Sequence, residues 1–180
     1  MKIAKQLKDT NIAEYLLYMW QIEDTLRAYK CDADRLRQEY AVRFDYSDAD
    51  RFEEGKWLAA LCQMMREEGK TESGHLQINQ GTLSLLTDLH LQLLQSSKHP
   101  FYSAAYYKAL PFIVELRSRN GHTDMPELEN CFELMYGVML LRLQKKPISK
   151  ETQEAVTHVS HLLALLADAW WKERKGELEL

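Results

Sequence analysis

The 180-residue sequence has no stretch in which apolar and polar residues alternate for long enough to form a β-strand. Its seven glycines are scattered, and none of them forms the GxGxxG or GxxxxGK[ST] pattern of a phosphate-binding loop. There is no unbroken apolar run of about 18 residues, so we expect no membrane-spanning helix. The first residues, MKIAKQLKDTN, interleave lysines with few apolar side chains and do not resemble a signal peptide.

The chain also lacks a basic excess and a paired set of cysteines. It has 23 Lys and Arg against 27 Asp and Glu, a formal net charge of -4, and nucleic-acid binding needs a basic excess or a basic face. We therefore expect no nucleic-acid partner. Cys31, Cys62 and Cys131 are an odd number and widely separated, as is typical of reduced thiols in a cytoplasmic protein. We expect no cofactor.

What the sequence does contain is helical periodicity, most clearly in residues 11–30, NIAEYLLYMWQIEDTLRAYK. Apolar residues recur there at steps of three and four along one face, from Ile12 through Met19 to Leu26. Leu17 and Trp20 add apolar surface outside that face. A helix that is apolar on nearly every side is typically surrounded by others, so we expect residues 11–30 to form the central helix of a bundle.

Similar patterns predict an all-α fold, a single globular bundle of about seven helices. The expected helices cover residues 11–30, 32–44, 47–68, 82–97, 99–119, 124–145 and 149 onward, with Asp124 near the start of the sixth. A polar loop at residues 69–81 separates a three-helix part from a four-helix part within one domain, residues 1–180. Residues 176–180 should fray.

The last expected helix carries one candidate metal site. Glu154, His158, His161 and Asp168 share one face, and histidines three residues apart with a nearby carboxylate can bind a metal ion if another helix adds ligands. The simpler interpretation is that these residues form the solvent-exposed face of an amphipathic helix, because they lie opposite its apolar stripe. We therefore predict no metal and keep His158, His161 and Glu154 as the weaker alternative.

A candidate pocket lies in the middle of the chain. His90 is a single ionisable side chain among leucines, and a buried imidazole can transfer protons. Tyr102 and Tyr106 belong to an aromatic run around Pro111 that could line a pocket. The alternative is that His90 is a core histidine with a hydrogen-bond partner and that the tyrosine rings fill the core.

The N-terminal segments Ile3-Ala4-Lys5-Gln6-Leu7 and Asn11 to Asp24, in a chain of this length, resemble a bacterial family of uncharacterised helical proteins. That family is seen mainly in anaerobic gut bacteria and carries a domain-of-unknown-function label. The resemblance is strongest over the N-terminal helix. It implies an all-helical cytoplasmic protein and brings no activity or catalytic residue to this chain.

These observations favour a non-enzymatic helical protein that binds a partner protein or a copy of itself. The interface candidates are apolar residues left over after the core faces are assigned, namely Leu17, Trp20, Leu91 and Trp171. No catalytic residue is predicted. The alternative is a small-molecule-binding or metal-dependent enzyme with its site inside the bundle, using His90 and Tyr106 or the His158 and His161 pair.

Overall fold

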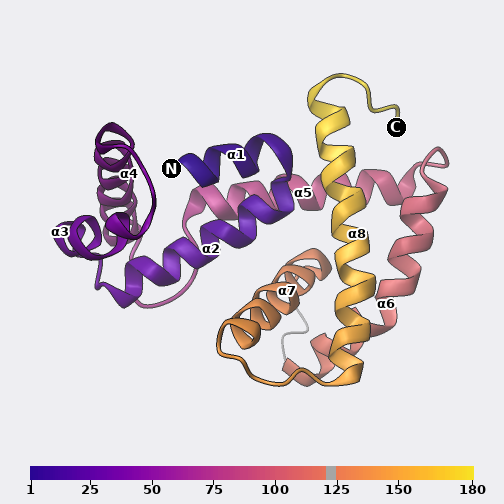
Figure 1. The fold of residues 1–180 in the computed structure, drawn as a ribbon. Helices are drawn as coiled ribbons and strands as arrows, with labels where there is room; N and C mark the ends of the chain where they lie inside the picture. Colours follow the sequence, from indigo (N-terminus) through magenta and orange to yellow (C-terminus); the bar gives the residue numbers. More distant parts are fainter. Residues whose placement is uncertain (121–124) are drawn as a thin grey trace. The chain divides into compact units, whose positions relative to one another are not determined.

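The computed structural model describes residues 1–120 and 125–180, which form eight α-helices and no strand (Figure 1). The helices are α1 (Lys2–Thr10), α2 (Ile12–Ala28), α3 (Ala33–Arg35), α4 (Asp48–Glu67), α5 (Gln77–Gln95), α6 (Pro100–Asn120), α7 (Glu127–Leu143) and α8 (Lys150–Arg174). The predicted all-α class is confirmed, with one helix more than the seven expected. Within the described residues, no helix has both the length and the apolar character needed to cross a membrane.

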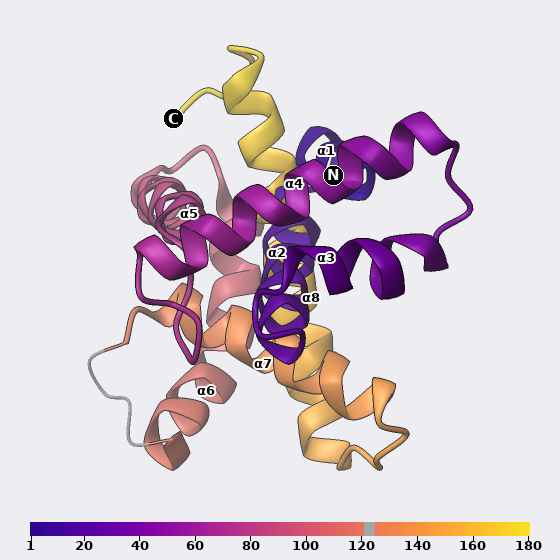
Figure 2. The ribbon, with the colours of Figure 1, turned by 90° about the vertical axis from the view of Figure 1, so that its left-hand side faces the viewer.

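The chain divides into two compact units, Met1–Thr82 and Leu83–Leu180, with the boundary inside α5. The single-domain organisation stays a prediction. In the first unit α2 packs against α1 and α4. Its start is fixed by Asn11, whose side chain accepts hydrogen bonds from the N–H groups of Ala13 and Glu14, and its inner face is buried. Figure 2 shows α4 and the short α3 of this unit.

Besides α1, which was not expected, two segments of the first unit differ from the prediction. The helix predicted over residues 32–44 starts at the Asp32 cap, as expected, but changes after α3 into a π-helical turn, Leu36–Tyr40, and a 3-10 turn, Ala41–Arg43. The loop predicted at residues 69–81 is shorter, because α5 already begins at Gln77. The Glu68 carboxylate accepts a hydrogen bond from the Gln77 N–H at 2.7 Å and so satisfies one of the free N–H groups at the start of the helix.

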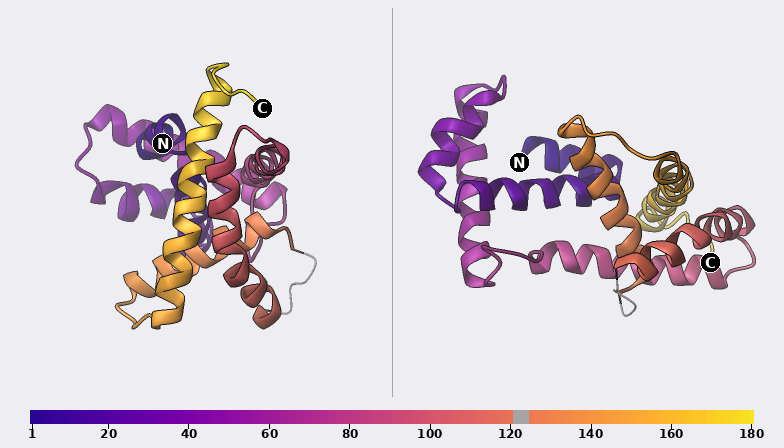
Figure 3. Two further views of the ribbon diagram at one scale, coloured as in Figure 1. Left: turned by 90° about the vertical axis from the view of Figure 1, so that its right-hand side faces the viewer. Right: turned by 90° about the horizontal axis from the view of Figure 1, so that it is seen from below.

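The second unit is built on α6 and α8, which run side by side (Figure 3), and α7 packs against both. Ser149 caps α8 by accepting a hydrogen bond from the Thr152 N–H at 3.1 Å, as its sequence position predicts. The apolar stripe of α8 is buried from Ala155 to Trp170. The cap predicted at Asp124 lies outside the described residues. After α8 ends at Arg174, residues 177–180 are not helical.

Candidate functional site

Glu23 is a fully buried carboxylate on the inner face of α2. Its Oε1 accepts hydrogen bonds from the Leu76 N–H at 2.8 Å and from Nδ2 of Asn79 at 2.7 Å. Its Oε2 lies 2.6 Å from Nδ1 of His75. In this contact Oε2 accepts when the imidazole carries its proton on Nδ1. These three bonds replace the water that burial removes from the charge.

The imidazole of His75 has a second contact, with the indole of Trp20. The two rings are stacked, with centroids 4.1 Å apart and 15° between their planes. Trp20 is therefore only 3% exposed. This corrects the expectation that its ring is surplus apolar surface: the segment before α5 brings His75 over it.

A carboxylate that orients an imidazole is also the arrangement of a general base. In this protein, however, the other carboxylate oxygen is occupied by the segment that leads into α5. Arg27, one turn further along α2, donates from Nε to the Lys70 carbonyl at 3.2 Å and from Nη2 to the Gly74 carbonyl. Glu23 and Arg27 together fasten residues 70–76 to α2, which is a structural role.

Sequence reasoning missed this cluster, although one signal was present. Glu23 follows Leu16 by seven residues and Met19 by four, so it lies on the buried face of α2. A carboxylate at such a position needs a buried partner. His75 could not be identified as that partner, because it lies in a polar segment 52 residues away.

The predicted pocket residues His90, Tyr102 and Tyr106 do come together, in the interior of the second unit. His90 Nδ1 lies 2.6 Å from the Tyr102 hydroxyl, and both residues are buried. The Tyr106 ring packs edge-on against His90 with centroids 5.3 Å apart, and its hydroxyl donates to Oε2 of Glu127 at 2.7 Å. Arg117 lies 3.6 Å from the other oxygen of Glu127. The side chains therefore satisfy one another.

Burial sets the protonation of this group. It lowers the pKa of His90, and the negative charge of Glu127 opposes that effect only partly, so the imidazole is held neutral. Burial likewise raises the pKa of Tyr102 and of Tyr106, and for Tyr106 the hydrogen bond to Glu127 adds to the rise. The tyrosines therefore stay protonated, and Tyr106 donates its hydroxyl proton to Glu127.

Of these three residues, Tyr102 lines a cavity of about 200 Å³. The cavity lies between the start of α6 and the C-terminal part of α8, with Leu165, Ala169 and Leu178 among its walls. At its edge the Lys172 ammonium pairs with Asp168 at 2.7 Å. This volume is below the roughly 300–1,000 Å³ typical of small-molecule sites.

The metal candidates on α8 are not brought together with further ligands. His158 stacks on Phe112 of α6, with centroids 5.3 Å apart and 16° between planes, while Glu154 and His161 are exposed. Among the residues that the structure describes, no three His, Cys, Asp or Glu side chains gather where they could hold a metal ion. The arrangement is that of an exposed helix face with one aromatic contact.

The remaining interface candidates lie on three different helices. Leu17 of α2 is half-buried, and Leu91 of α5 is 50% exposed. Trp171 of α8 is half-buried, and the Lys175 ammonium lies 5.7 Å from the centroid of its ring. Leu17 belongs to the first unit, and Leu91 and Trp171 belong to the second.

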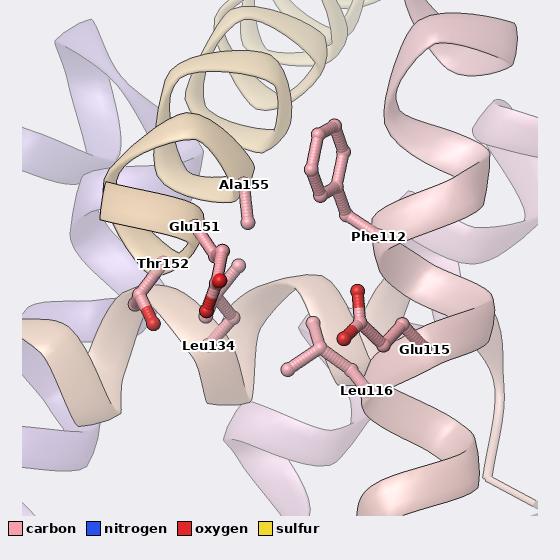
Figure 4. Close-up of a pocket in the computed structure, with 7 residues that line it drawn as sticks. All are labelled: Phe112, Glu115, Leu116, Leu134, Glu151, Thr152 and Ala155. Atoms are coloured by element: carbon pink, nitrogen blue, oxygen red, sulfur yellow. The ribbon is translucent and has the colours of Figure 1, made fainter. Parts of the chain in front are cut away.

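A small cavity of about 40 Å³ lies where α6, α7 and α8 meet (Figure 4). Phe112 and Leu116 of α6, Leu134 of α7 and Ala155 of α8 form its apolar walls. Two carboxylates, Glu115 and Glu151, also line it. Its volume is enough for one water molecule and too small for a metabolite.

A larger hollow adjoins it, a shallow groove of about 440 Å³ along α7. Apolar residues of α7 form most of its surface: Leu134, Gly137, Val138, Leu140 and Leu141. Glu133, Gln144 and Thr152 provide its polar positions. Leu134 and Thr152 line both hollows, so the groove continues into the corner between α7 and α8. We refer to these eight residues as the α7 groove.

The α7 groove exists because α7 has more apolar surface than its neighbours cover. Its sequence, ELENCFELMYGVMLLRL, is apolar on nearly every side, and packing against α6 and α8 buries Leu128, Cys131 and Phe132. Leu134 and Leu141 remain half-buried. Sequence reasoning identified the helix but not this surface. The sequence pattern that indicates this surface is a second stripe of non-polar residues on α7, at positions 134, 137 and 141, beside the stripe that is buried.

A family model described as Domain of unknown function (DUF4924) matches residues 1–177 of the chain. This range includes both compact units and every helix of the described residues. No curated protein and no solved structure matches the chain.

Proposed function

We propose that this chain, which belongs to the family described as Domain of unknown function (DUF4924), works without catalysis by binding a protein partner through the α7 groove. The observation that carries the proposal is the groove itself, an apolar surface on a helix whose other side is packed. Contiguous apolar surface of this kind is typical of sites that bind protein chains.

The size and chemistry of the hollows support a macromolecular partner. The cavities of about 40 Å³ and 200 Å³ are smaller than a typical small-molecule site. The α7 groove, at about 440 Å³, is large enough, but it is shallow and mostly apolar, with few polar groups to orient a small ligand. An amphipathic helix from another chain fits such a surface, because its apolar face can fill the groove while its polar face stays in water.

The polar clusters support binding over catalysis. Each oxygen of Glu23 already has a partner within the chain, and His90 is bonded to Tyr102. A catalytic acid or base needs an atom within hydrogen-bond reach of a substrate. In both clusters these atoms hold segments of the fold together.

We also propose that the protein works in the cytoplasm. All three cysteines are free and buried, which suits a reducing compartment. Burial raises the pKa of Cys62 and of Cys131 to about 12, so these thiols resist the oxidation that thiolates undergo.

A photo-crosslinking amino acid at Leu141, in the groove, tests the proposed function in cells of the organism that makes the protein. The expected result is a discrete adduct with another protein chain, mapped by mass spectrometry to an amphipathic helix. The matched control carries the same group at Glu173, which is exposed near the end of α8. Equal or absent labelling from both positions would contradict binding through the groove.

A further inference from the structure

We infer that the partner in the α7 groove is a second copy of this chain, whose own α7 lies antiparallel to the first. The inference rests on the proposed function, because it takes the groove to be a binding site for a helix. Three features of α7 lead to it: the spacing of its groove residues, the open space at Gly137, and the distribution of charge along the helix.

The spacing is that of a helix-pairing surface. Leu134, Gly137, Leu141 and Gln144 follow one another at steps of three, four and three residues, as in the seam of a coiled coil. When two such stripes run antiparallel, the first position of one faces the last position of the other. Leu141 of each copy then lies over Gly137 of the other, and Leu134 meets the aliphatic part of Gln144.

Gly137 makes this register a good fit. A Cβ atom at this position would meet no other atom within 4 Å, so the chain itself leaves the space above it empty. A leucine side chain from the second copy can fill this space. The missing side chain also lets the two helix axes approach toward the short end of the usual 8–10 Å range.

The charges of α7 favour the antiparallel orientation. The acidic residues of the helix lie in its first half, Glu127, Glu129 and Glu133, and basic residues lie at its end and in the turn that follows, Arg142, Lys145 and Lys146. A parallel pair would place like charges side by side. In the antiparallel pair, Glu133 is level with Lys145 of the other copy, and the two helix dipoles are also opposed.

The resulting contact is closed. Each copy offers the same surface to the other about a twofold axis, so pairing uses both grooves and leaves none for a third chain. A dimer with twice the chain mass of 21.1 kDa is therefore expected, without longer assemblies.

Sedimentation velocity of the full chain over a range of concentrations tests the pairing. The wild type should shift from the single-chain mass towards twice that mass. Gly137→Arg should raise the dimer dissociation constant at least about tenfold, because the new side chain occupies the space that Leu141 fills. Gly81→Arg is the matched control, since Gly81 is also helical with no atom within 4 Å of a Cβ, but lies on α5. It should dimerise as the wild type does.

Charge reversal tests the orientation. Glu133→Lys, or Lys145→Glu together with Lys146→Glu, should each weaken the dimer by about tenfold, because each change places like charges together at two symmetric positions. Combining all three substitutions should restore dimerisation. Circular dichroism of each variant confirms that the surface changes leave the helices intact.

Three outcomes would overturn the inference. They are a wild type that keeps the single-chain mass at every concentration, a dimer that Gly137→Arg does not weaken, and charge variants that dimerise as well as the wild type. The proposed function fails separately, when the crosslinker at Leu141 gives no adduct beyond the control. A monomer that crosslinks from Leu141 to a different protein would leave the proposed function standing and remove the second copy as the partner.

Discussion

At the scale of single residues, two glutamates of α2 differ sharply in what they do. Glu23 is fully buried and accepts hydrogen bonds from three groups, whereas Glu14 is exposed. Glu23→Ala would leave the Leu76 N–H, His75 and Asn79 without their acceptor. We expect it to lower the free energy of unfolding by about 3–5 kcal/mol, measured by urea unfolding.

Glu14→Ala is the control on the same helix, and it should change the free energy of unfolding by no more than about 0.5 kcal/mol. If Glu23→Ala proved as mild as Glu14→Ala, the Glu23 cluster would not be what holds residues 70–76 to α2.

His90 gives the second prediction at this scale, a loss of stability in mild acid. Burial lowers the pKa of His90 below its ordinary value of 6.5, so between the two pKa values the unfolded chain binds a proton that the folded chain does not. Stability is therefore complete above about pH 6.5 and falls as the pH drops towards the folded pKa. One such proton contributes a slope of at most about 1.4 kcal/mol per pH unit.

Urea unfolding of the wild type and His90→Gln at a series of pH values from neutral to mildly acidic measures this effect. As the pH falls, the free energy of unfolding of the wild type should fall more than that of His90→Gln. Glutamine does not titrate, and the other histidines are common to both proteins. Parallel curves would show that His90 is not held neutral by the fold.

At the scale of secondary structure, two glycines allow opposite predictions from the same substitution. Gly81 is exposed within α5, and a Cβ there meets nothing, so Gly81→Ala should raise the free energy of unfolding by about 1 kcal/mol through helix propensity. Gly69 also has open space but a φ of +66°, which alanine adopts with strain. Gly69→Ala should lower stability by about 1 kcal/mol. Thermal unfolding followed by circular dichroism measures both, and equal signs would contradict the backbone argument.

Helix periodicity explains why most elements could be predicted from the sequence. The stripes of α2, α4 and α8 are long enough to specify a helix by themselves. By contrast, α1 was missed because its nine residues, KIAKQLKDT, hold only three apolar side chains. A helix this short gains its stability from packing, here against α2, which no local pattern reveals. The start of α5 was predicted too late, because Gly81 suggested a loop. The helix begins earlier, at Gln77, whose N–H donates to the Glu68 carboxylate.

The candidate sites were harder to predict, because they depend on which surfaces meet. His90, Tyr102 and Tyr106 were pocket candidates because they lie within 17 residues of one another, on α5 and α6; their contacts with one another do not test whether they bind a ligand. Trp20 was expected to be exposed because a helical wheel does not show that His75 returns to cover it. The α7 groove depends on which side of an evenly apolar helix α6 and α8 leave uncovered, and that is a property of packing.

At the scale of the whole molecule, the charge of the chain does not prevent two copies from meeting. Two charges of -4 placed about 30 Å apart repel by roughly 2 kcal/mol in water without salt. With a Debye length of about 10 Å at 0.1 M salt, this falls to roughly a tenth of a kcal/mol. The local distribution of charge along α7 therefore matters more for association than the net charge does.

Dimerisation through the α7 groove would couple the stability of the unit Leu83–Leu180 to protein concentration. Above the dissociation constant, a tenfold rise in concentration stabilises each chain by about half of RT ln 10, or about 0.7 kcal/mol, by mass action. For a chain of this size that corresponds to a rise in Tm of about 1–3 °C. Differential scanning calorimetry should show this rise for the wild type and for Gly81→Arg, and a smaller rise over the same concentrations for Gly137→Arg, because its dimer is weaker. A Tm that rises equally in all three proteins would mean that they associate through a surface other than the α7 groove.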